Sequence, residues 1–60
     1  MKYKVGDIIR QRTFLDKHRY VKVTAKFDDV KNGNPGFDGY VLGDKNNTVW
    51  GYDYQILKVM

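Results

Sequence analysis

The most regular feature of the chain is an alternation of apolar and polar residues between positions 19 and 27. The apolar members fall at every second position: Val21, Val23, Ala25 and Phe27. A period of two puts side chains of this kind on one face of an extended strand. The pattern therefore predicts a half-buried antiparallel strand over residues 19–27, with these four side chains in the core.

A second strand is predicted over residues 6–13, where a Gly-Asp turn signal precedes two isoleucines. Glycine tolerates a positive φ at such a turn, and aspartate bonds nearby backbone amides. Because Ile8 and Ile9 are adjacent, the alternation alone leaves open which of them faces inward. We favour Ile9 as the buried residue, which directs Arg10 and Arg12 outward.

Turn signals divide the rest of the chain. Phe14 and Leu15 begin a loop over residues 14–18 and are expected to fold back over an open end of the sheet. The dipeptides Asn-Gly at 32–33 and Pro-Gly at 35–36 predict a shaped loop over residues 28–38. Beyond it we expect a strand at 39–43, a polar turn at 44–47, a strand at 48–52, a tight 3₁₀-like turn at 52–55 and a last strand at 55–60.

Composition also favours a sheet. Aspartate supplies every acidic charge, glutamate and serine are absent, and Ala25 is the single alanine, whereas valine and aromatic residues are abundant. Helix formers are thus scarce, and residues that suit a pleated surface are plentiful. Residues 1–60 are expected to form one domain of marginal stability, about 3–5 kcal/mol. Without cysteine to cross-link it, a core of Trp50, valines and isoleucines must hold the fold.

The order of these elements indicates a fold. Five short strands, with a long loop near each end of the second strand and a brief turn before the fifth, follow the order of a Src-homology-3-like barrel. We therefore predict an all-β fold, a small five-stranded antiparallel barrel of this kind with a short 3₁₀ turn before the last strand. The alternative is an oligonucleotide/oligosaccharide-binding barrel, which usually needs more residues and often a helix between its third and fourth strands.

Two resemblances follow from these residues. The opening Val5-Gly6-Asp7-Ile8-Ile9-Arg10 resembles the start of many bacterial and viral barrels of the KOW, Tudor and chromo-barrel type. Stretches 18–24, 28–39 and 49–56 together resemble small uncharacterised proteins encoded by bacteriophages of actinobacteria. The second likeness covers most of the chain and implies a phage-encoded accessory protein, with no catalytic residues.

One departure limits what the resemblance implies. Src-homology-3 domains that bind proline-rich peptides carry an Ala-Leu-Tyr-Asp-Tyr run in the first loop. Here the one Tyr-Asp-Tyr run is at 52–54, near the far end of the chain. Binding of proline-rich ligands is therefore not implied.

The net charge of +4 is unevenly distributed: residues 1–26 hold eight Lys or Arg and two Asp, and residues 27–60 hold three Lys and five Asp. The candidate nucleic-acid ligands of the basic half are Arg10, Arg12, Lys17, Arg19, Tyr20, Lys22 and Lys26, with His18 among them. Lys22 and Lys26 are expected on one face of a strand, about 13 Å apart. Cationic side chains bind phosphates with release of counterions, and a tyrosine ring can stack on a base. The alternative, which we favour, is a solvated face that also protects a sheet edge.

Four aromatic residues form a second candidate surface: Tyr40, Trp50, Tyr52 and Tyr54. Aromatic cages bind methylated ammonium groups through the ring quadrupole. In small barrels such residues more often anchor the core or its rim, and we favour that role here.

The segment 28–38 carries many carboxylate and amide oxygens, but it lacks the ligand spacing of a calcium loop, and no metal site is predicted. Within it, a candidate protein-binding loop with an apolar tip is formed by Asn34, Pro35, Gly36 and Phe37.

Little in the chain suggests catalysis. Asp16 and His18 have no nucleophile nearby except Thr13 and no third group to orient them. We predict a binding module, neither an enzyme nor a cofactor protein, whose partner is a host or phage protein. Nucleic-acid binding is the first alternative, and a self-assembling structural role is the second; a monomer or weak homodimer is expected. No membrane-spanning run or targeting signal is visible, which favours the cytoplasm, that of the host cell if the protein is phage-encoded.

Overall fold

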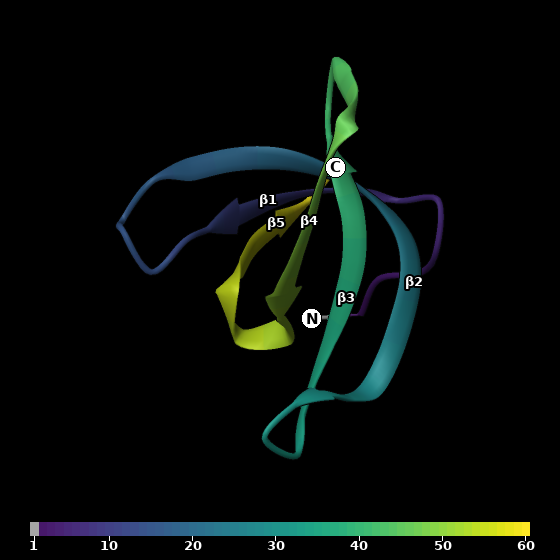
Figure 1. The fold of residues 1–60 in the computed structure, drawn as a ribbon, viewed down its shortest axis with the longest axis vertical. Helices are drawn as coiled ribbons and strands as arrows, with labels where there is room; N and C mark the ends of the chain where they lie inside the picture. Colours follow the sequence, from purple (N-terminus) through teal and green to yellow (C-terminus); the bar gives the residue numbers. More distant parts are fainter. Residues whose placement is uncertain (1) are drawn as a thin grey trace.

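The computed structural model describes residues 2–60 and contains one antiparallel sheet and a single 3₁₀ turn (Figure 1). Its elements are β1 (Ile8–Arg12), β2 (His18–Lys31), β3 (Asn34–Val41), β4 (Asp44–Tyr52), η1 (Asp53–Gln55) and β5 (Ile56–Val59). The strand order is β4-β3-β2-β1-β5, which leaves β4 and β5 as edges of an open sheet. The predictions of an all-β fold with five antiparallel strands and a 3₁₀ turn before the last are confirmed.

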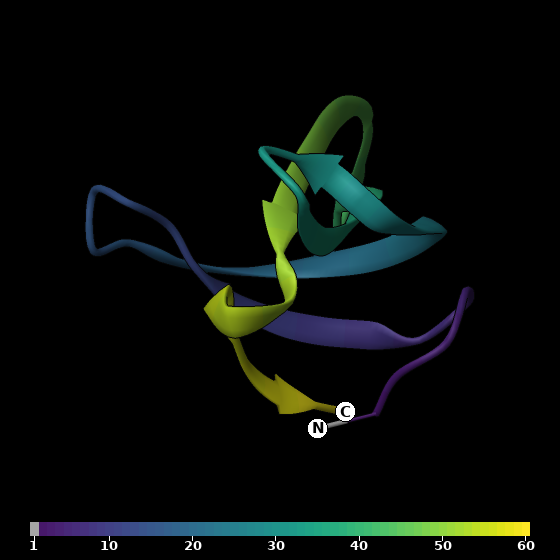
Figure 2. The same cartoon turned by 90° about the horizontal axis from the view of Figure 1, so that it is seen from below.

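The sheet bends because β2 is long and irregular. Its register with β3 shifts twice, between Val23 and Ala25 and between Phe27 and Lys31. Such bulges bend a strand and increase its twist. Figure 2 shows the result: β2 crosses the middle of the molecule, with β1 and β5 on one side of it and the β3–β4 hairpin on the other.

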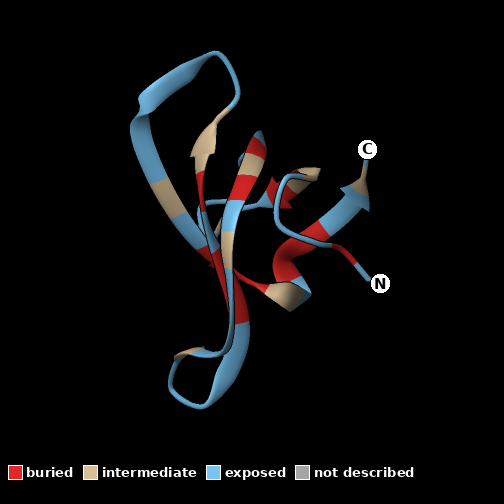
Figure 3. Ribbon diagram, turned by 90° about the vertical axis from the view of Figure 1, so that its right-hand side faces the viewer, coloured by how far each residue is buried: buried red, intermediate tan, exposed pale blue. Residues whose placement is uncertain are grey.

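The core lies inside this bend. Its buried apolar side chains are Tyr3, Ile9, Val21, Val23, Phe37 and Ile56. In Figure 3 the buried segments, in red, gather where the strands approach one another, and the hairpin tips are exposed. The predicted burial of Ile9, Val21 and Val23 is confirmed.

The alternation predicted for β2 fails beyond Val23. Val23 lies opposite Gly39 and Ala25 opposite Asp38, so two steps along β2 match one step along β3. This bulge moves the later residues to the opposite face of the sheet. Ala25 is therefore only partly buried, and Phe27 is 42% exposed, which corrects the expectation that both belong to the core.

The predicted loop over residues 28–38 is wrong. β2 runs on to Lys31 and β3 begins at Asn34. Asn32 and Gly33, with φ of 56° and 78°, form the two-residue connection. Positive φ at both central residues is typical of the tight hairpin turn that matches sheet twist. Asn-Gly is thus the actual turn, and the Pro-Gly dipeptide at 35–36 lies within β3.

The connection between β3 and β4 is also shorter than predicted. The chain turns at Leu42 and Gly43, and Gly43 has a φ of 89°. Such a positive φ suits glycine because an L side chain there is strained. The polar residues 44–47, expected as the turn, instead begin β4.

Candidate functional site

Four aromatic rings gather at the end of β4, around a buried tyrosine. The Tyr52 ring stacks on Tyr54, with centroids 5.0 Å apart, and meets Trp50 edge-on at 5.3 Å. The Phe14 ring meets Tyr52 edge-on at 6.0 Å. Tyr52 is buried, whereas Phe14 is 71%, Tyr54 67% and Trp50 40% exposed. This aromatic cluster (Phe14, Trp50, Tyr52, Tyr54) therefore presents three rings to solvent over one buried ring.

Three separate elements carry the cluster. Trp50 and Tyr52 are two apart in β4, Tyr54 is in η1, and Phe14 is in the turn between β1 and β2. That turn is closed by the Thr13 amide donating to the Lys17 carbonyl, at 2.8 Å. The cluster is thus assembled from segments about 40 residues apart in sequence.

The structure brings together most of the predicted aromatic surface and adds a residue to it. Trp50, Tyr52 and Tyr54 meet as described, whereas Tyr40 lies in β3 opposite Thr48 and stacks on no ring within residues 2–60. Phe14 was not predicted as a member, although its place at the start of a loop suggested contact with the rest of the fold. Trp50, expected in the core, is 40% exposed and lies at the surface, with its ring against the buried Tyr52 ring.

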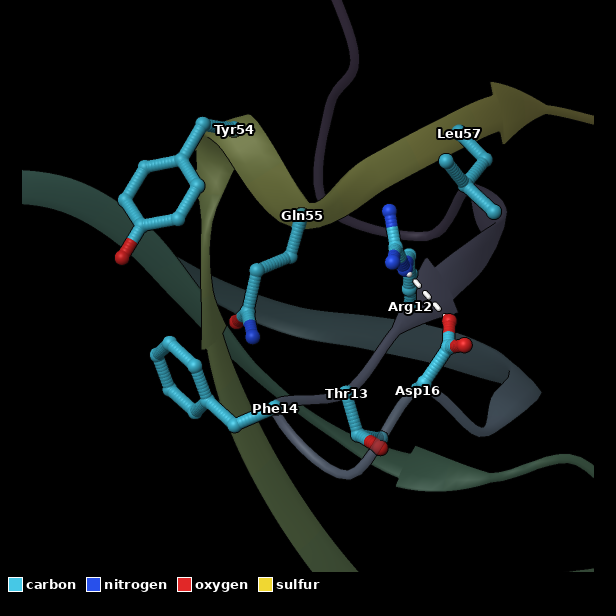
Figure 4. A pocket seen from close by; sticks show the side chains of 7 residues that line it. All are labelled: Arg12, Thr13, Phe14, Asp16, Tyr54, Gln55 and Leu57. Atoms are coloured by element: carbon cyan, nitrogen blue, oxygen red, sulfur yellow. Dashed lines mark hydrogen bonds and ion pairs between the residues drawn. The ribbon is translucent and has the colours of Figure 1, made fainter.

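An open groove lies beside the cluster (Figure 4). This aromatic groove has a volume of about 300 Å³ and is lined by Arg12, Thr13, Phe14, Asp16, Tyr54, Gln55 and Leu57. Figure 4 shows the Phe14 and Tyr54 rings on one side and the Arg12–Asp16 ion pair on the other. The Arg12 Nε to Asp16 Oδ1 distance is 2.7 Å, so the charge of Arg12 has a carboxylate beside it. The groove offers apolar rings with a neutralised ion pair at its rim.

A smaller hollow adjoins the aromatic groove, and the two share Thr13, Phe14 and Gln55. This arginine hollow, about 160 Å³, is also lined by Gln11, Arg19 and Trp50. Its cation comes from β2 and its two amide side chains from β1 and η1.

Two buried glutamines fix the walls of the arginine hollow. Gln11 Nε2 donates to Gln55 Oε1 at 3.1 Å and to the Trp50 carbonyl at 3.3 Å. Gln55 Oε1 also accepts from the Tyr52 amide at 2.9 Å. Buried amides with satisfied hydrogen bonds hold one geometry, because leaving any group unpaired is costly. This glutamine network ties β1, β4 and η1 together beneath the aromatic cluster.

Arg19 completes the network. Its Nε donates to Gln11 Oε1 at 2.9 Å. Burial lowers the pKa of Arg19, since desolvation disfavours the charged guanidinium. Within residues 2–60 the ion pairs are Lys4–Asp7 and Arg12–Asp16, and Arg19 takes part in neither. Arg19 was predicted as a nucleic-acid ligand, but it lies opposite Gln11 and shares the inward face of the sheet.

Only part of the predicted basic set forms a continuous face. Arg10 lies opposite Tyr20 on one side and Lys58 on the other, and Lys22 lies opposite Tyr40. These five residues define the outer face, on the side of the sheet opposite Ile9 and Val21 (Arg10, Tyr20, Lys22, Tyr40, Lys58). Lys58 was missed because its pairing with Arg10 joins strands at opposite ends of the sequence.

Other members of the basic set lie elsewhere. Lys26 Nζ donates to the Tyr3 carbonyl at 2.7 Å and lies 4.2 Å from the centroid of the Tyr3 ring. The bulge after Val23 places Lys26 opposite buried Phe37, so the expectation that Lys22 and Lys26 share a face is wrong. Lys17 is in the exposed β1–β2 turn, and His18 Nδ1 lies 2.8 Å from an Nη atom of Arg10.

The predicted protein-binding loop is divided by the hairpin. Asn34 and Pro35 are exposed beside the Asn-Gly turn, but Gly36 and Phe37 are buried. The Phe37 ring packs edge-on against Tyr3, 6.0 Å between centroids. The apolar tip expected at Phe37 is therefore wrong, because this ring is part of the core.

Two hydrogen bonds secure the N-terminal segment. The Tyr3 hydroxyl donates to Asp53 Oδ1 and so joins this segment to η1. Burial, followed by the hydrogen bond to Asp53, raises the pKa of Tyr3 well above its usual range. Asp7 Oδ2 accepts from the Lys4 amide at 3.0 Å, and this bond lowers the pKa of Asp7.

Comparison with protein-family models, with curated proteins and with solved structures gave no match to this chain. Among residues 2–60, no three side chains of His, Asp, Glu or Cys come together as a set of metal ligands. No helix in the described part of the chain is long and apolar enough to span a membrane.

Proposed function

We propose that this protein is a non-enzymatic binding module, a Src-homology-3-like barrel that binds a segment of a protein partner at the aromatic cluster. The strand order β4-β3-β2-β1-β5, the strong bend of β2 and the 3₁₀ turn before β5 support the barrel assignment. The resemblance to phage proteins makes a host or phage protein the expected partner.

The observation that carries the proposal is the exposure of aromatic rings that pack against a buried ring. Phe14 and Tyr54 are mostly exposed, yet both contact the buried Tyr52 ring and line the aromatic groove. Tyrosine and tryptophan dominate the energetics of protein interfaces because they bury a large area with few rotatable bonds. Exposed apolar side chains gathered around a groove are typical of a recognition site rather than of scattered surface residues.

Selection from a library of random peptides, followed by affinity measurement, tests this proposal. The double variant Phe14→Ser, Tyr54→Ser is expected to bind the selected peptides at least about 30-fold more weakly, since aromatic anchors at interfaces contribute about 2 kcal/mol or more. The matched control is Tyr20→Ser, Leu42→Ser, which removes two exposed apolar side chains away from the groove. Equal binding by the parent and the Phe14/Tyr54 variant, or failure to select any peptide, contradicts the proposal.

A second candidate function, nucleic-acid binding, is favoured by the outer face. There Arg10, Lys22 and Lys58 lie across three neighbouring strands with Tyr20 and Tyr40 among them. Cationic side chains bind phosphates with release of counterions, and tyrosine rings stack on bases. This arrangement retains three members of the predicted basic set and replaces Lys26 by Lys58.

On the nucleic-acid hypothesis, Lys22→Glu with Lys58→Glu abolishes binding to single- and double-stranded DNA and RNA. In the parent, affinity falls steeply with salt because each neutralised phosphate releases counterions. The control Lys2→Glu, Lys45→Glu makes the same change in net charge at exposed sites off the outer face. A titration at several salt concentrations in which the two double variants bind equally well excludes this function for the outer face.

A further inference from the structure

We propose that the arginine hollow receives a carboxylate of the bound peptide, held by the guanidinium of Arg19 beside Phe14 and Trp50. The inference rests on the proposed function and names the chemistry of its ligand: an Asp or Glu side chain next to a large apolar residue. The carboxylate occupies the arginine hollow, and the apolar neighbour occupies the aromatic groove. The two sites adjoin through Phe14, Thr13 and Gln55, so one short segment reaches both.

The charge of Arg19 has no carboxylate to balance it within the described residues. Arg12 has Asp16 and Lys4 has Asp7, but within residues 2–60 no carboxylate lies within 4.0 Å of the Arg19 guanidinium. Arg19 is nevertheless partly buried and lines a concave site. A desolvated cation without a counter-ion is unfavourable, and an incoming anion relieves that cost. The hollow is thus complementary to one negative charge.

The donors of Arg19 are also set in advance. Nε bonds Gln11 Oε1, and Gln11 is held in turn by Gln55 and the Trp50 carbonyl. No bond from either Nη atom to another side chain or the backbone is formed in the described part of the chain. Guanidinium N–H groups are arranged as a planar fork that binds carboxylates in two parallel hydrogen bonds. Because the side chain is already fixed at Nε, less conformational entropy is lost when a ligand binds.

The surroundings favour a single carboxylate over a chain of phosphates. Asp16 lines the aromatic groove, Asp38 lies opposite Trp50 across the sheet, and Asp53 precedes Tyr54. Asp16 is paired with Arg12, and Asp53 accepts from the Tyr3 hydroxyl. The carboxylate of Asp38 is therefore the one that repels a polyanion running past Trp50. One acidic side chain flanked by apolar residues meets the arginine without placing further negative charge beside Asp38. A peptide therefore fits this site better than a nucleic acid.

The test compares peptides that differ only in charge. Probes are the peptides selected above, their counterparts with Asp→Asn or Glu→Gln, and an oligothymidylate. We expect the parent to bind the acidic peptides at least about 10-fold more tightly than the amide peptides, as a charge-assisted hydrogen bond contributes about 1.5–3 kcal/mol. Arg19→Gln is expected to remove this preference, while Lys17→Gln, which loses the same charge from the neighbouring exposed turn, preserves it.

The outcomes separate this inference from the proposed function. Peptides whose binding depends on Phe14 and Tyr54, but which show no preference for the acid form, overturn the carboxylate site alone. If Arg19→Gln loses oligothymidylate binding and the parent shows no preference for acidic over amide peptides, the arginine hollow binds phosphate. That result also overturns the carboxylate site. If Arg19→Gln fails to fold by circular dichroism, the acid-to-amide ratio in the parent still decides the question. If no peptide binds, both proposals fail.

Discussion

Phe37→Ala is expected to unfold the domain at room temperature. Phe37 is 0% exposed and is the largest fully buried side chain, packed against Tyr3 within the bend of the sheet. Removing a buried phenylalanine ring costs about 3–5 kcal/mol, because burial energy is lost and a cavity is left. A domain of this size has about 3–5 kcal/mol of stability in total, so the loss is comparable with the whole.

The matched control for this experiment is Phe27→Ala. Phe27 lies in β2 opposite Gly36, one residue before Phe37 in β3, but its side chain is largely exposed. Its removal is expected to cost under about 1 kcal/mol, because little buried area is lost. Urea unfolding, monitored by circular dichroism, measures the free energy of unfolding of both variants. A Phe37→Ala protein as stable as the Phe27→Ala protein contradicts the placement of the core around Phe37.

The two phenylalanines show where sequence pattern stops being informative. Alternation correctly predicted the buried side chains of β2 up to Val23. It wrongly placed Phe27 on the same buried face. The sequence alternates without interruption through Thr24, where the strand bulges, so the bulge leaves no trace in the pattern. The bulge bends the sheet, and it is visible in the pairing of β2 with β3 rather than in the sequence of β2 alone.

Turn chemistry is ambiguous for a related reason. Asn-Gly and Pro-Gly dipeptides both favour turns, and they stand one residue apart in this chain. Taken together, the two dipeptides predict a long loop. The register between β2 and β3 shows that the first dipeptide, Asn-Gly, forms the turn. Pro35 then falls in the irregular stretch of the pairing between Phe27 and Lys31, where a missing amide hydrogen costs least. Phe37 enters the core as a result.

The candidate site was predictable only where its residues are close in sequence. Trp50, Tyr52 and Tyr54, which stand at every second position, were predicted together with Tyr40. The partners that give the site its shape are distant: Gln11 and Gln55 are 44 residues apart, and Phe14 packs on Tyr52. Neither contact has a local signal, since both depend on how β1 and the turn after it meet β4 and η1 across the bend.

Gly51→Ala is expected to disrupt the fold and the site together. A Cβ atom at Gly51 meets the amide end of Gln11 and lies 2.8 Å from Phe37 Cζ, inside normal contact distance. Overpacking of this kind costs about 1–3 kcal/mol. Displacing Gln11 also breaks its bonds to Gln55 and the Trp50 carbonyl and removes the acceptor for Arg19. We expect a loss of about 2–4 kcal/mol, with weaker peptide binding in whatever protein remains folded.

A double-mutant cycle with Gln11→Ala separates overpacking from loss of the network. Gln11→Ala alone leaves the Arg19 Nε and the Trp50 carbonyl without their partner, and it is expected to be destabilising by itself. In the double variant, the smaller side chain at position 11 makes room for the methyl group introduced at position 51. The double variant is therefore expected to lose less free energy of unfolding than the sum of the losses in the two single variants. Thr48→Ala, at an exposed position of β4, is the control for a change that meets no buried group. Strict additivity in the cycle means that Gln11 does not occupy the space beside Gly51, and the support proposed for Arg19 and the aromatic cluster then fails with it.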